Sequence, residues 1–182
     1  MKATGIVRRI DDLGRVVVPK EIRRTLRIRE GDPLEIFTDR EGEIILKKYS
    51  PIGELGTFAK LYAESLAQTL GVLVCVTDKD QVVAAAGNGK KEFQDRHIHK
   101  YLTKVIEERE HILAKSGEKK YIPIVTDQEE KYAFQIICPI ISEGDAIGSV
   151  VILEKSEKKG LEEIERKVAM VAAEFLGRQM EQ

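Results

Sequence analysis

Apolar and polar positions follow different periods on the two sides of residue 50. Before it, short apolar runs alternate with turn residues, which is typical of strands. Pro19 interrupts this pattern and opens a short helix that we expect to end near residue 27. Strands are predicted over 5–10, 15–18, 34–38 and 43–49, with turns at 11–14 and 39–42. Residues 1–50 therefore form a predicted domain of four strands and one helix.

Residues 51–53 contain Pro and Gly, break this pattern and are predicted to be a linker. Beyond them, apolar residues recur every three or four positions over 54–70, which predicts an amphipathic helix. Further helices are predicted over 95–110 and 161–180, and strands over 72–77, 81–86, 121–126, 132–141 and 146–154. Residues 54–182 thus form a second predicted domain, and the fold class is α+β.

Two features of the chain predict self-association. The first domain holds sixteen aliphatic or Phe side chains, close to the size at which a lone core becomes marginal, so we expect two copies to share one core. The last helix carries an apolar seam with heptad spacing, which either packs on the chain's own sheet or pairs with another helix. If both domains pair, and with different partners, a homotetramer results. The candidate oligomer contacts are Leu55, Phe58, Tyr62, Leu161, Ile164, Val168 and Phe175.

Charge is distributed unevenly along the chain. The formal net charge is −1, but residues 1–29 hold nine basic and three acidic residues, a net of +6 that leaves −7 for the rest. A basic end on an acidic body indicates an anionic partner for that end. In the predicted first helix the basic residues are spaced to share one face, and Glu21 is its one acidic residue. This pattern favours a phosphate-binding surface over a merely solvated helix.

Aromatic residues are absent from residues 1–36, so bases have no rings there on which to stack. This disfavours a platform for single strands or RNA and favours double-stranded DNA, with arginines on phosphates and on guanine edges. The candidate DNA contacts are Lys2, Arg8, Arg9, Arg15, Lys20, Arg23, Arg24 and Arg27.

Catalytic chemistry finds little support in the sequence. His97 and His99 stand two positions apart on a predicted helix, so they point apart and cannot chelate one metal ion. Cys75 and Cys138 lie in apolar runs, which favours buried, unreactive thiols. We expect no catalytic residue, no metal and no cofactor. Neither a signal peptide nor an apolar run long enough for a membrane span is evident, so a cytoplasmic protein is expected.

The first fifty residues closely resemble the AbrB-type transition-state regulators. The resemblance rests on the segments 1–8, Leu13-Gly14-Arg15-Val16-Val17-Val18-Pro19, 21–26, 30–35 and 44–49, in the family's order. It implies a swapped-hairpin β-barrel, in which two chains interleave hairpins into one DNA-binding dimer. It also implies that four arginines contact the DNA, and these match Arg8, Arg15, Arg23 and Arg24.

The remainder resembles a GAF-type sensory domain, an antiparallel sheet flanked by helices. The resemblance rests on the hairpin pattern Pro139-Ile140-x-x-x-Gly144-x-x-Ile147-Gly148-x-Val150-x-Ile152. It implies either a small-molecule effector, whose identity and pocket are unknown, or a domain kept for oligomerisation. Residues 87–120, rich in Gly, Lys and Glu, are expected to be a lid over such a pocket or a solvated excursion.

The two resemblances together imply a transcription regulator of sporulation genes that acts as activator, repressor or both. Two alternatives belong to other classes. Swapped-hairpin domains also head antitoxins, although those usually end in a disordered acidic tail and this chain ends in a predicted folded domain. Some GAF domains reduce methionine sulfoxide, which requires exposed cysteines that can reach each other.

Overall fold

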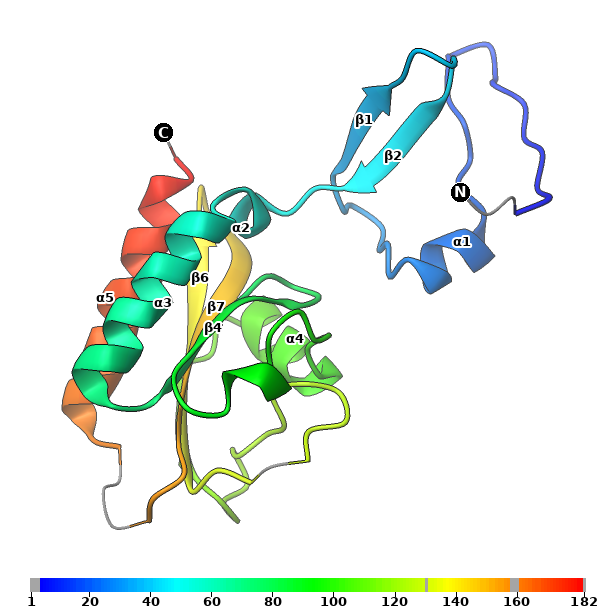
Figure 1. The fold of residues 1–182 in the computed structure, drawn as a ribbon. Helices are drawn as coiled ribbons and strands as arrows, with labels where there is room; N and C mark the ends of the chain where they lie inside the picture. Colours follow the sequence, from blue (N-terminus) through cyan, green and yellow to red (C-terminus); the bar gives the residue numbers. More distant parts are fainter. Residues whose placement is uncertain (1–3, 130, 158–160, 182) are drawn as a thin grey trace. The chain divides into compact units, whose positions relative to one another are not determined.

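The computed structural model describes residues 4–129, 131–157 and 161–181. The chain divides into two compact units, an N-terminal unit of residues 1–49 and a C-terminal unit of residues 50–182 (Figure 1). Within the described ranges, no helix combines the length and the apolar character needed to cross a membrane.

Over residues 4–49, the N-terminal unit contains one short helix, α1 (Lys20–Thr25), and one hairpin of two strands, β1 (Leu34–Thr38) and β2 (Ile44–Lys48). The hairpin is antiparallel, from Leu34 opposite Lys48 to Thr38 opposite Ile44. The two strands predicted over 5–10 and 15–18 do not form within this chain, although the turn at 11–14 between them does. A strand needs a ladder partner, and the described part of the unit provides none for these residues.

The N-terminal unit has almost no core of its own. Among its described residues Pro19 is buried, whereas twelve large apolar side chains are at least 38% exposed. The most exposed are Val7, Val17 and Leu13, at 85%, 71% and 70%. Leaving so much apolar surface in water opposes folding, and a second surface that covers it would relieve this cost.

The C-terminal unit is built on a five-stranded antiparallel sheet with strand order β4-β3-β7-β6-β5. Every residue of strand β3 is buried, as are nearly all of β6 and of the central strand β7. A sheet covered on both faces explains these continuous apolar runs. The strands are β3 (Leu73–Thr77), β4 (Val82–Ala86), β5 (Ile112–Lys115), β6 (Phe134–Ser142) and β7 (Asp145–Glu154).

Helices cover both faces of this sheet (Figure 1). On the first face lie α3 (Gly56–Leu70) and α5 (Glu163–Gln179), preceded by the single turn α2 (Pro51–Glu54). On the second face lie the 3₁₀ turn η1 (Lys90–Glu92) and α4 (Lys100–Glu107), together with the loops around them. Each face has its own apolar core, and the sheet separates the two.

Small residues let α3 and α5 lie close to the sheet. The buried residues of α3 are three alanines spaced by four, Ala59, Ala63 and Ala67. In α5 the buried residues include Gly177, where a Cβ would stand 2.0 Å from the Ile141 carbonyl oxygen. Apart from the buried Leu176, the larger apolar side chains of α3 and α5 are therefore left partly or wholly outside the core.

Several predicted elements of the C-terminal part differ from the structure. The predicted linker 51–53 belongs to helix α2, because Ser50 accepts a hydrogen bond from the Gly53 amide at 3.1 Å and Pro51 takes the first helical position. Ile52 is fully buried, so this segment is anchored in the core. The N-terminal unit, predicted to end at residue 50, ends at Tyr49.

The helix predicted over 95–110 begins only at Lys100, because residues 95–98 bond instead to the outer edge of β4 and its turn. The strand predicted over 121–126 is reduced to one bridge between Ile98 and Val125. Strand β5 was missed, because its alternation of buried Ile112 and Ala114 with exposed neighbours lies among many charged residues.

Candidate nucleic-acid interface

The predicted DNA contacts lie on the N-terminal unit, and most of their side chains are exposed. We call them the cationic surface; its described members are Arg8, Arg9, Arg15, Lys20, Arg23, Arg24 and Arg27. All of these are exposed except Arg23, which is half-buried. Lys2 lies outside the described residues.

The turn at 11–14 fixes the main chain beside Arg15. One carboxylate oxygen of Asp11 accepts hydrogen bonds from the amides of Leu13, at 3.0 Å, and Arg15, at 2.8 Å. The other accepts from the Arg15 guanidinium at 2.8 Å. These bonds, that of the Arg15 amide foremost, hold the pKa of Asp11 below its usual range. Arg15 is thus held at the turn by an exposed ion pair that a phosphate can displace at little cost.

Helix α1 presents fewer of the cations than predicted. It ends at Thr25, and Arg27 follows it in the left-handed region at φ 54°, so Arg27 does not continue the helical stripe. The predicted stripe therefore keeps Lys20, Arg23 and Arg24. Arg23 also donates from Nε to the Val18 carbonyl at 3.2 Å, which orients its guanidinium. Arg23 thus makes a structural contact from its side chain, and nothing in the sequence indicated this contact.

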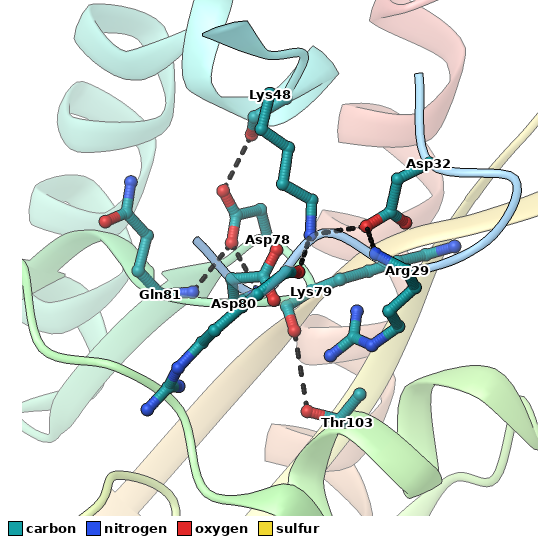
Figure 2. A network of polar contacts seen from close by, with 10 residues as sticks. Arg29, Asp32, Lys48, Asp78, Lys79, Asp80, Gln81 and Thr103 are labelled. Carbon is teal, nitrogen blue, oxygen red and sulfur yellow. Dashed lines mark hydrogen bonds and ion pairs between the residues drawn. The ribbon is translucent and has the colours of Figure 1, made fainter. Parts of the chain in front are cut away.

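A lysine outside the predicted set holds the segment that follows α1. The Lys48 ammonium of β2 lies 2.8 Å from the Asp32 carboxylate and donates to the Arg27 carbonyl at 3.0 Å (Figure 2). The Asp32 carboxylate also accepts from the Arg29 amide at 2.7 Å. Burial raises the pKa of Asp32, but the Arg29 amide and Lys48 outweigh it and the net pKa is lowered. Lys48 thus fixes the chain between α1 and the hairpin.

The predicted oligomer contacts divide into buried and exposed residues. Leu161 is buried in the core of the first face, and Leu55 and Val168 are half-buried. Ile164 and Phe175 remain 68% and 39% exposed. Ile164 and Phe175 therefore face away from the chain's own sheet, on which α5 packs through its small residues and Leu176.

An aromatic cluster joins α3 and α5 on this outer surface. The Tyr62 and Phe175 rings lie 5.4 Å apart and stack, and Phe58 lies 5.8 Å from Phe175. Around them, Leu61 and Val171 are 59% and 62% exposed. Leu61 was not among the predicted contacts, although it follows Phe58 at the helical spacing of three. We call the aromatic cluster with Leu61, Ile164 and Val171 the helical seam.

The region between the sheet and residues 87–120 is filled by the chain's own side chains. Phe93, Leu102 and Ile106 are fully buried there, and the Phe93 ring packs edge-on against Tyr132 at 5.7 Å. The prediction that 87–120 is merely a solvated excursion is therefore wrong, because α4 and β5 anchor it in the second core. Its role as a lid over an effector stays a prediction.

The two thiols lie on opposite faces of the sheet. Cys75 belongs to the core of the second face and Cys138 to that of the first, and strand β7 runs between their strands. Both side chains are fully buried. Burial raises the pKa of both thiols, that of Cys138 to about 12. Neither thiol is thus a nucleophile at neutral pH, and the two cannot form one redox pair without unfolding.

One group of described residues has the composition of a metal site. Asp39, Glu41 and Glu43 bring carboxylate oxygens within 4.8 Å of one another in the β1–β2 turn. One oxygen of Asp39 is already occupied by the amides of Glu41 and Glu43, at 3.0 and 2.9 Å. This hydrogen bonding is that of a hairpin turn, so we assign no metal to it.

Comparison with known proteins finds separate families for the N-terminal and C-terminal parts of the chain. Residues 54–181 match the family described as "Stage V sporulation protein T C-terminal, transcription factor", and residues 7–54 match "Antidote-toxin recognition MazE, bacterial antitoxin". Transition state regulatory protein AbrB of Bacillus subtilis is 67% identical over 51 residues, which are 28% of this chain and 52% of that protein.

The C-terminal unit has a GAF-like fold. The GAF domain of PixJ from Thermosynechococcus elongatus aligns with a TM-score of 0.58 at 15% identity, over 74% of this chain and 89% of that one. Stage V sporulation protein T of Bacillus subtilis is 53% identical over 182 residues, the full length of both proteins. The chain therefore belongs to the stage V sporulation protein T family of transcription factors.

Proposed function

We propose that the chain regulates transcription of sporulation genes by binding duplex DNA through the cationic surface of its N-terminal unit. The observation that carries the proposal is the gathering of exposed arginines around one turn and one short helix. Arginine forks suit both phosphate oxygens and guanine edges. This unit has no aromatic side chain before Phe37, so duplex DNA fits it better than single strands. Such a protein acts where the chromosome lies, in the cytoplasm.

The DNA-binding form is a dimer of N-terminal units. Twelve exposed apolar side chains in the described part of the unit support this proposal, as do two segments of strand-forming composition without a ladder. If two copies exchange residues 5–18 as hairpins, each copy gives the other's strands their ladder hydrogen bonds. The same exchange covers the exposed apolar side chains of both copies. Each dimer then carries two copies of the cationic surface.

The helical seam is the proposed contact of the C-terminal units. Its exposed apolar side chains on two adjacent helices form a patch of the kind that pairs with another helix. Pairing there between different dimers gives a tetramer, and several weak DNA contacts then act together by effective concentration.

Sensing of a small molecule is the second role proposed for the C-terminal unit. The filled second face favours oligomerisation as the primary role, since an effector on that face must displace packed side chains. A metabolite screen by thermal shift on residues 50–182 separates the two roles. A compound that raises the melting temperature and alters DNA affinity supports sensing, and the absence of any such compound favours the scaffold.

The alternative functions are less well supported. The antitoxin family matched by residues 7–54 covers the N-terminal unit, but the transcription-factor family matches most of the chain. A methionine sulfoxide reductase requires thiols that can reach each other, whereas Cys75 and Cys138 are buried on opposite faces. We therefore propose that the protein is not an enzyme.

Fluorescence anisotropy with labelled duplexes tests the proposal. Arg8→Ala and Arg24→Ala in the full-length chain should each weaken duplex binding severalfold, because each removes a cation from both copies in a dimer. Arg40→Ala is the matched control, since Arg40 is also exposed but lies in the β1–β2 turn outside the cationic surface. Equal affinities for all three variants would exclude the cationic surface as the DNA contact.

A further inference from the structure

The first residue of the C-terminal unit is tied to the turn between β3 and β4. The Ser50 hydroxyl donates to one carboxylate oxygen of Asp78 at 2.8 Å and accepts from the Gly53 amide at 3.1 Å. Ser50 directly follows the last residue of the N-terminal unit, so its side chain fixes the point at which that unit is attached. A change in this contact therefore acts on the attachment of the cationic surface.

Asp78 is held rigidly at the end of β3. It is 7% exposed, and its second carboxylate oxygen accepts from the amides of Asp80 and Gln81, both at 2.7 Å (Figure 2). Beneath it, the fully buried hydroxyls of Thr77 and Ser149 lie 2.8 Å apart and bond across β3 and β7. The carboxylate is thus fixed on the turn, and Thr77, the residue before it, is fixed on the sheet.

The opposite side of the same turn is bonded to the segment that leads into α4. The Asp80 carbonyl accepts from the Ile98 amide at 2.9 Å. The Lys79 carbonyl accepts from the Thr103 hydroxyl of α4 at 3.4 Å (Figure 2). Ile98 and Leu102, from this segment, are buried in the second core. The four-residue turn 78–81 therefore has the attachment point on one side and the cover of the second face on the other.

We propose that the turn 78–81 couples the second face of the sheet to the attachment point at Ser50. A ligand or a partner that moves residues 97–103 shifts the turn, alters the bond between Asp78 and Ser50, and so changes the DNA affinity of the N-terminal unit. This inference rests on the proposed function only for its last step. Coupling between the two sides of the turn is a property of the C-terminal unit itself, and it is reciprocal.

Two variants of Ser50 whose new side chains match each other in shape test the contact between Ser50 and Asp78. Asn and Asp both cap a helix well, so Ser50→Asn and Ser50→Asp each keep the bond to Gly53. Asn also donates to Asp78, whereas Asp places a second carboxylate beside it. Adding Asp78→Asn to Ser50→Asp restores the hydrogen bond, because the new amide at position 78 donates to the new carboxylate at position 50. Ser65→Ala is the control, since the Ser65 hydroxyl bonds only within α3, to the Leu61 carbonyl at 2.9 Å.

Amide hydrogen exchange of the full-length protein is the direct readout. Ser50→Asp should speed exchange in residues 98–103 by about tenfold, the effect of losing one charge-assisted hydrogen bond. Ser50→Asn, the double variant and Ser65→Ala should leave it near the wild-type rate. In the reverse direction, Thr103→Val should speed exchange of the Gly53 amide. If the changes stay within residues 50–56 for Ser50→Asp, or within α4 for Thr103→Val, the coupling does not exist.

Duplex affinity of the same proteins tests the last step. Ser50→Asp should differ from Ser50→Asn by at least about threefold in dissociation constant, and equal affinities would refute the link to DNA binding. If the wild-type protein binds no duplex, the proposed function fails, and hydrogen exchange alone still decides whether the turn couples its two sides.

Discussion

Val17→Ala is the substitution that separates a shared core from an exposed surface most sharply. Val17 is 71% exposed in the single chain. If it stayed exposed in the functional protein, removing two methyl groups would change stability by less than about 0.5 kcal/mol. If the dimer covers Val17, the part of those two methyl groups that becomes buried stabilises the dimer. At about 0.8 kcal/mol per buried methylene, this contribution is about 1 kcal/mol per chain.

Two copies of this change lower dimer stability by about 2 kcal/mol, which is roughly a thirtyfold rise in the dimer dissociation constant. The assay is urea unfolding of residues 1–50, with sedimentation to follow association. For the unchanged sequence, a hundredfold dilution should lower the apparent stability by about 2.7 kcal/mol per dimer. Thr38→Ala is the control, because Thr38 is exposed and has nearly the shape of valine. Unfolding independent of concentration, or equal effects of the two variants, would refute the shared core.

Three further predictions concern the interior and one ion pair. Gly177→Ala should lower the free energy of unfolding of the C-terminal unit by about 1–3 kcal/mol, because the new Cβ meets a main-chain oxygen of β6 at 2.0 Å; a normal melting temperature would contradict this packing. Cys75 and Cys138 should not react with a thiol reagent until the protein unfolds, and rapid labelling of native protein would show that they are accessible. Asp32→Asn should destabilise the N-terminal unit at neutral pH. Because the folded state lowers the pKa of the Asp32 carboxyl, the ionised carboxylate stabilises the wild type only above the carboxyl pKa of the unfolded chain, about 4. The difference in stability between the variant and the wild type should therefore vanish as the pH falls below about 4. Melting curves across pH measure this, and a difference that grows in acid would contradict the role given to Lys48.

Elements with a clear period were predictable from the sequence. The helix 54–70, the hairpin around residues 142–145 and the seam of the last helix all follow from local spacing, and the structure contains each of them. The N-terminal strands 5–10 and 15–18 have strand composition but no ladder in one chain. In the proposed dimer these segments pair with a second molecule, and the local spacing that predicts a strand does not specify its ladder partner.

The elements that the sequence misplaced or left out depend on tertiary contacts or are too short to show a period. Residues 95–98 have helical spacing, yet their main chain bonds to the edge of β4 and its turn, a tertiary contact that overrides the local pattern. Strand β5 has only four residues, and its two buried positions are separated by exposed ones. The turn 78–81 contacts Ser50 through Asp78 and Thr103 through Lys79, and only the folded sheet brings these residues together.

The salt dependence of duplex binding tests the central claim most directly. If the cationic surface binds phosphates, the logarithm of the association constant should fall linearly with the logarithm of salt concentration. Arg24→Ala should reduce that slope by about 1.8, since a dimer loses two contacts of about 0.9 each, while Arg40→Ala should leave it unchanged. Affinity that does not respond to salt, or an unchanged slope in Arg24→Ala, would contradict the account.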